Sequence, residues 1–142
     1  MILLLTPDQC SAYWHDLKQA VKIAMPSIGD NSDEGLNEVL SSLLTGTSQA
    51  WALLDATQVV AITITVIHQE PVSKARNLLI YALAGYANIK QELWLEGFNR
   101  LKAFATEMNC RKIIAYSSVP RVLDIAVGLG GNTNTHLLEW EI

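Results

Sequence analysis

The sequence predicts an α/β protein of the α+β type, with helices flanking a mixed β-sheet. Residues 77–83 are nearly continuous apolar sequence, typical of a strand buried on both faces, and they lead into an amphipathic helix that begins near Gln91. Three strand-like segments also follow one another in the middle of the chain, which excludes a simple alternation of strands and helices. The predicted order is β-α-α-β-β-β-α-β-α-β, in a single domain of residues 1–142.

The first half of the chain carries clear helix signals. A short strand, Ile2–Leu5, precedes Thr6 as N-cap, Pro7 at the first helical position and Gln9 three residues after the cap. We expect one helix from there to the residue before Pro26, with one face buried by Cys10, Tyr13, Trp14, Leu17, Ala20, Val21 and Ala24. Ser32 then caps a second helix, which ends at Gly46.

The remaining elements follow from residue type and periodicity. Strands are predicted at Gln49–Leu54 and Gln58–His68, joined by a tight turn, and the second is central because both of its faces are apolar or small. The helix after Gln91 should carry a Glu96–Arg100 pair on its exposed side. A strand at 112–117 and a short helix at 120–127 come next. Residues 136–142 alternate apolar and polar, which predicts a half-buried final strand.

Composition limits the possible partners. The net charge is −4 and only 17% of residues are charged, so the clustered Lys and Arg that nucleic-acid binding requires are missing. Half of the residues are apolar and four are Trp. Either the core is well filled with a few aromatics exposed, or apolar surface remains for an oligomer or assembly partner.

Cys10 and Cys110 lie a hundred positions apart, so we expect free thiols in a reducing compartment and neither a zinc site nor a redox pair. No His, Cys, Asp or Glu cluster has metal-ligand spacing. The apolar start is too short for a secretory signal, and no segment approaches the roughly 18 residues of a membrane span. These features predict a cytoplasmic protein that is not secreted and does not bind membranes.

The C-terminal third contains Val119-Pro120-Arg121, a short helix, Gly128-Leu129-Gly130-Gly131 and a closing strand. With the preceding elements, this order resembles the GNAT acetyltransferase superfamily over essentially the whole chain. The resemblance implies a mostly antiparallel sheet and acetyl transfer from acetyl-CoA to an amine. Small proteins similar to this one occur in tailed bacteriophages, some as virion components, so the resemblance also implies a possible place in a phage particle.

Several residues depart from the pattern of that family. The loop that would hold the pyrophosphate of acetyl-CoA matches Gly85, Tyr86, Ala87 and Asn88, where only Gly85 fits. Tyr86 and Ile89 are expected to stand where the phosphates should lie, and Glu92 to repel them, although Glu92 would also stabilise the helix dipole by itself.

Three more positions differ in the C-terminal motifs. Ala126 replaces the tyrosine that protonates the leaving thiolate, Val119 replaces the turn asparagine, and Gly131 replaces a phenylalanine. These departures favour a protein without a cofactor-binding site and without catalytic residues.

If the protein is nevertheless an enzyme, His68 and Glu70 at the end of the central strand are the candidate base. A solvated strand end is the alternative explanation for this pair. Of the other histidines, His15 is expected on the exposed face of its helix and His136 in the core. Tyr13 and Trp14 fit a core role better than contact with an acceptor. No serine-hydrolase motif surrounds Ser117.

Two hypotheses of different classes result. The first is a GNAT-fold structural or interaction module that has lost acetyl-CoA, associating with itself or other proteins through the C-terminal strand around Trp140. The second is an acetyl-CoA-dependent N-acyltransferase that uses His68 or Glu70 and the loop Gly85–Asn88. A regulatory or toxin-neutralising binding protein is a third hypothesis.

Overall fold

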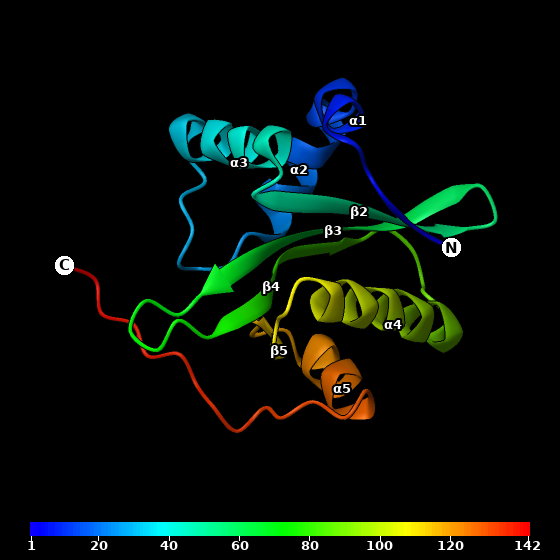
Figure 1. The fold of residues 1–142 in the computed structure, drawn as a ribbon. Coiled ribbons are helices and arrows are strands. Elements are labelled where there is room, and N and C mark those ends of the chain that lie inside the picture. Colours follow the sequence, from blue (N-terminus) through cyan, green and yellow to red (C-terminus); the bar gives the residue numbers. More distant parts are fainter.

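The computed structural model describes residues 1–142 and contains one five-stranded sheet with the strand order β1-β2-β3-β4-β5 (Figure 1). Strands β1 to β4 pair antiparallel, whereas β5 runs parallel to β4. Their bounds are β1 Ile2–Leu4, β2 Ser48–Asp55, β3 Gln58–Gln69, β4 Arg76–Gly85 and β5 Lys112–Ala115. The predicted fold class, a mixed and mostly antiparallel sheet flanked by helices, is confirmed.

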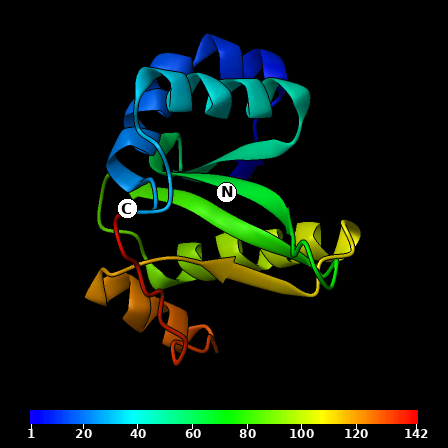
Figure 2. The ribbon, with the colours of Figure 1, turned by 90° about the vertical axis from the view of Figure 1, so that its left-hand side faces the viewer.

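The helices form two layers, one on each face of the sheet (Figures 1 and 2). One layer holds α1 Pro7–Ala12, α2 Trp14–Ala24 and α3 Asp33–Thr45; the other holds α4 Gln91–Glu107 and α5 Pro120–Gly128. No helix is both long enough and apolar enough to cross a membrane.

The expected caps are present. Thr6 and Gln9 form a reciprocal capping box at the start of α1, and the Ser32 hydroxyl accepts from the Gly35 N–H at 3.2 Å. Gly46 ends α3 with a φ of 79°, a conformation that glycine adopts without steric cost.

The single first helix was wrong, because the chain bends at Tyr13. The bend lets α1 pack against α3 while α2 packs against β4, and it leaves Tyr13 57% exposed. One straight helix could not place a single apolar face against both α3 and β4, because these two elements lie in different directions.

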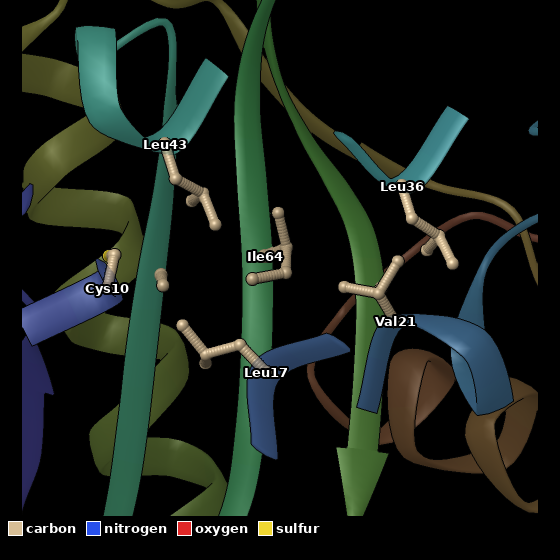
Figure 3. Packing of buried hydrophobic residues seen from close by; sticks show 8 residues of the cluster. Cys10, Leu17, Val21, Leu36, Leu43 and Ile64 are labelled. Carbon is tan, nitrogen blue, oxygen red and sulfur yellow. The ribbon is translucent and has the colours of Figure 1, made fainter. Parts of the chain in front are cut away.

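Each face of the sheet has its own core. Under α1–α3 the buried side chains are Cys10, Leu17, Val21, Leu36, Leu43, Ala50, Ile64 and Ala82 (Figure 3). Under α4 they are Trp51, Leu78, Leu101, Phe104 and Ala105. A third cluster, Leu53, Val60, Ala61 and Ile89, lies near the start of α4.

The predicted final strand at 136–142 is also wrong. No regular element follows α5, and no residue after Ala105 is buried. The segment instead runs from α5 toward the loop between α2 and α3, where the Ser27 hydroxyl donates to Glu139 Oε1 at 2.8 Å (Figure 2). A segment with this alternating pattern forms a strand only when it pairs with the edge of another strand, and residues 136–142 pair with no strand of this chain.

Candidate functional site

Strand β4 is open on one side over its second half. It pairs with β5 only from Asn77 to Ile80, whereas its pairing with β3 continues to Gly85. The β3–β4 register also shifts between Ile64 and Thr65, which leaves Tyr81 as the extra residue of a β-bulge. A bulge redirects side chains, and an open edge exposes main-chain hydrogen-bonding groups, so a ligand could bind here.

The open half of β4 leads directly into the start of α4. Six successive N–H groups, from Ala87 to Glu92, donate no hydrogen bond within the protein. The N-cap is Lys90, whose side chain does not cap the helix. Free N–H groups and the positive end of the helix dipole together favour an anion at this position.

Ile89 and Tyr86 were expected to block this position. Ile89 is only 8% exposed and packs against Leu53, Val60 and Ala61, but it also borders the space between the starts of α4 and α5. Its obstruction of a phosphate stays a prediction. Tyr86 is half exposed, and its pKa is raised by burial and, secondly, by Asp16 on α2. Glu92 does lie in the first turn of α4.

A hollow of about 320 Å³ lies between the start of α4 and α5. We call it the α4–α5 hollow. Arg121, from the first turn of α5, lines it together with Gln91 and Trp94, while Asp124 contributes a carboxylate. Arg121 forms no salt bridge; the one salt bridge joins the Met1 amino group to Glu96 at 3.4 Å. Its guanidinium is therefore free to pair with an anion.

A second hollow, of about 580 Å³, lies on the other face of the sheet, between α3, the loop 28–30 and strands β2–β4. We call it the acidic hollow, because Asp30, Glu34 and Glu38 line it. Tyr81 lines it as well, from the bulge of β4. The two hollows thus lie on opposite faces of the sheet. The acidic hollow reaches Tyr81, the first residue of β4 beyond its pairing with β5, and the α4–α5 hollow lies past the end of β4, at the start of α4.

Hydrogen bonding and burial shift the pKa values of Asp30 and Tyr81 in the acidic hollow. The Ser32 N–H donates to Asp30 Oδ1 at 2.9 Å and holds the pKa of Asp30 below its usual value. Burial raises the pKa of Tyr81, and the nearby Asp30 adds to the effect, so its hydroxyl stays protonated. A Cβ at Gly29 would lie 2.5 Å from the Met25 side chain and 2.7 Å from that hydroxyl, so a larger residue here would displace both side chains. The hollow suits a cationic ligand.

His68 and Glu70 lie at the tip of the β3–β4 hairpin, away from both hollows. His68 pairs with Asn77, near the start of β4. At a rise of about 3.3 Å per residue, Asn77 lies about 26 Å from Gly85 at the end of the strand. The Glu70 carboxylate accepts from the N–H groups of Ser73 at 2.6 Å and Val72 at 3.1 Å, and from the Ser73 hydroxyl. These bonds lower the pKa of Glu70 and occupy both of its oxygens. The catalytic role of this pair stays a prediction.

The other sequence candidates are accounted for by packing or exposure. Trp14 packs against the core under α1–α3, as expected, and His15 is exposed. His136 is exposed as well, so its predicted place in the core is wrong. A Cβ at Gly131 would lie 2.8 Å from the Ala126 carbonyl oxygen, which explains glycine where the resemblance implies phenylalanine.

Sequence reasoning missed the acidic hollow. Asp30, Glu34 and Glu38 are spaced by four residues, without the basic partners that usually accompany such a pattern on a helix. Three acidic residues at this spacing, without basic partners, were the sequence signal that could have indicated an acidic site. The role of Tyr81 depends on the bulge, which no local sequence pattern revealed.

Known structures match this fold over nearly their whole length. AAC(6')-Iy in complex with the bisubstrate analogue CoA-S-monomethyl-acetylneamine aligns with a TM-score of 0.72 and 9% identity, over 100% of this chain and 97% of the other. A predicted acetyltransferase with acetyl-CoA from Clostridium acetobutylicum aligns with a TM-score of 0.72 and 16% identity, over 99% and 95%.

The aminoglycoside 6'-N-acetyltransferase AAC(6')-Ih from Acinetobacter baumannii aligns with a TM-score of 0.71 and 12% identity, over 100% and 97%. No family model matches the sequence, and none of the curated proteins compared with it is a significant match. At these identities the similarity shows the fold alone, which is that of the GNAT acetyltransferases.

Proposed function

We propose that the protein is a CoA-dependent N-acyltransferase whose acceptor is a cationic amine. One observation carries the proposal: a hollow suited to a cation reaches Tyr81 in the unpaired half of β4, and a hollow suited to an anion lies on the other face of the sheet at the start of α4, to which this half of β4 leads. The structural neighbours that act on amines or hold CoA compounds support it.

On the donor side, the residues present fit a diphosphate. The free N–H groups of residues 87–92 would hold its oxygens, with Lys90 and Arg121 supplying positive charge against Glu92 and Asp124. Bound acetyl-CoA would supply an activated acyl group whose C–S bond breaks as a C–N bond to the amine forms.

On the acceptor side, Asp30, Glu34 and Glu38 would bind the ammonium groups of the substrate, and a carboxylate or water would accept the proton that the attacking amine loses. The bulge at Tyr81 sets the depth at which the amine reaches the open edge of β4. Ala126 supplies no proton, which the reaction tolerates because a thiol pKa of about 8.5 makes the thiolate a good leaving group.

Calorimetric titration with acetyl-CoA tests the donor side. We expect micromolar binding, and binding weaker by on the order of tenfold in Arg121→Ala, since a hydrogen bond to a charged group contributes about 1.5–3 kcal/mol. Lys22→Ala, which removes a cation from α2 on the opposite face, is the matched control and should bind as the unaltered protein does. No heat of binding at millimolar acetyl-CoA would refute the proposal.

Release of free thiol from acetyl-CoA tests the acceptor side. We expect turnover with polyamines or aminoglycosides, and Glu38→Gln should raise KM for a polycationic acceptor while changing kcat little. His68→Ala is the control, because His68 lies outside both hollows. Loss of turnover in His68→Ala with KM unchanged in Glu38→Gln would return the catalytic role to His68 and Glu70.

The competing candidate is an interaction module that no longer binds acetyl-CoA. Ala126 and the anionic Glu92 at the helix start favour it. This candidate predicts no binding of acetyl-CoA by the unaltered protein and by the Glu92→Gln variant alike.

A further inference from the structure

The chain after α5 returns to the side of the sheet that holds the acidic hollow. It leaves α5, in the layer of α4, and reaches the loop between α2 and α3 in the other helical layer (Figures 1 and 2). There the Ser27 hydroxyl donates to Glu139 Oε1 at 2.8 Å, the one side-chain hydrogen bond between this segment and the rest of the protein. The next three residues of the loop, Ile28, Gly29 and Asp30, line the acidic hollow. The segment is therefore held at the rim of this hollow.

Burial does not explain why the segment lies there. None of residues 132–142 is buried, and Trp140 is 79% exposed, so packing contributes little to holding the segment. One hydrogen bond between exposed side chains contributes little as well, because water competes for both groups. Fixing these residues in place costs conformational entropy. A ligand that contacts the segment and the hollow together would offset that cost.

The segment brings carboxylates to a rim that already has one. Glu139 and Glu141 are exposed, and Asp30 lies three residues from Ser27, at most about 11 Å along the chain. Residues 132–142 and the lining of the hollow contain no Lys or Arg, and none of these carboxylates forms a salt bridge. Carboxylates on one rim repel one another, and a cation bound between them removes the repulsion. The rim therefore favours a ligand with several separated positive charges.

We propose that residues 136–142 are the outer wall of the acceptor site, where Glu139 and Glu141 select acceptors with widely separated ammonium groups. This inference rests on the function proposed above. One ammonium group would bind in the acidic hollow, and an outer one would bind the Glu139 carboxylate, for which it is a stronger partner than the neutral Ser27 hydroxyl. Ser27 is then a positioning residue that holds the wall in place before the acceptor arrives. The exposed ring of Trp140 offers a further face to a cation.

Steady-state kinetics with two linear amines tests the selection. Glu139→Gln should raise the KM for spermine, a tetraamine, by about threefold, the effect expected when one solvent-exposed ion pair is lost. The KM for putrescine, a shorter diamine, and kcat with either amine should stay the same, because the inner site is unchanged. Glu107→Gln removes the same charge from an exposed position of α4, on the other face of the sheet, and should change neither KM.

Deletion of residues 136–142 removes both carboxylates and no buried side chain, so the variant should fold and should have at least the spermine defect of Glu139→Gln. Turnover by the deletion variant with an unchanged KM for spermine would overturn the outer wall and leave the proposed function standing. A defect of equal size with putrescine would also overturn it, since the segment would then act on the inner site.

Calorimetric titration with spermine, in the absence of acetyl-CoA, separates the wall from the reaction. Binding should weaken by about threefold in Glu139→Gln and less in Ser27→Ala, and Ser27→Ala should have no further effect once Glu139 is replaced. This result would support the wall even if no amine were acetylated, which would refute the proposed function alone. Equal affinity of Glu139→Gln and the unaltered protein, or no binding of spermine by either, would overturn the wall.

Discussion

Thr65 lies at the centre of a buried polar chain between two strands. The Trp51 Nε1–H donates to Thr65 Oγ1 at 2.9 Å, and the same hydroxyl donates to Gln49 Oε1 at 2.9 Å. Trp51 and Thr65 are fully buried, so neither group has water as an alternative. Phe104 meets the Trp51 ring edge-on, with ring centroids 5.2 Å apart. The hydroxyl thus fixes the orientation of the largest buried side chain.

Thr65→Val should destabilise the protein by about 1–3 kcal/mol, because it leaves the indole N–H buried and unpaired without creating a cavity. Chemical unfolding measures the loss. In a Trp51→Phe background the same substitution should cost less, because no N–H is left to satisfy. Equal costs in both backgrounds would show that the hydrogen bond contributes nothing.

Glu70 makes the hairpin between β3 and β4 sensitive to acid. Its hydrogen bonds from Ser73 and Val72 lower its pKa from the usual 4.5, so its contribution is present above that value and disappears as pH falls through the lowered pKa. The protection factor of the Ser73 amide, which is its exchange rate corrected for the intrinsic pH dependence of exchange, should fall as pH drops through that lowered pKa. Glu70→Gln should show a low protection factor at every pH; a protection factor of the unaltered protein that does not change with pH would contradict this.

Helix ends are the elements that the sequence predicted best. Thr6, Ser32 and Gly46 act through local backbone chemistry, which depends on neighbouring residues alone. The predictions of one continuous first helix and of a Glu96–Arg100 pair were wrong, because tertiary partners compete with local interactions. Arg100 lies 5.1 Å from the Trp51 ring centroid, and Glu96 pairs with the Met1 amino group.

Gly46→Ala tests whether the end of α3 depends on conformation alone. No atom lies within 4 Å of the added Cβ, so the expected loss of about 1 kcal/mol comes from the positive φ. Gly128 has equally open space and no positive φ, and is the matched control. Gly128→Ala should be neutral or stabilise by at most about 1 kcal/mol in thermal unfolding. Equal losses at both sites would exclude the conformational explanation.

At the scale of the whole molecule, sequence reasoning found the sheet and the helices that cover it, because burial on two faces leaves a periodic apolar pattern. It missed the two hollows, since the fold alone brings Tyr81 beside Asp30 and Glu38 on one face of the sheet, and Arg121 beside Gln91 on the other. It also misplaced the strand at 136–142, because an alternating segment does not reveal which strand edge it would need.

Hydrogen exchange should divide the molecule according to burial. Strands β2 and β3, which have neighbours on both sides, should exchange slowly at every protein concentration. Residues 136–142, which belong to no helix or strand and include no buried residue, should exchange fast. Protection of this segment comparable to that of β3 would show that it pairs with a strand.

Trp51 and Trp140 lie at opposite extremes of exposure, at 0% and 79%. Their fluorescence should differ accordingly: acrylamide should quench the emission of Trp140 and leave that of Trp51 almost untouched. With Trp14 and Trp94 replaced by Phe, the chain would carry its own optical signal for any change in the exposure of its C-terminal segment, with no attached dye.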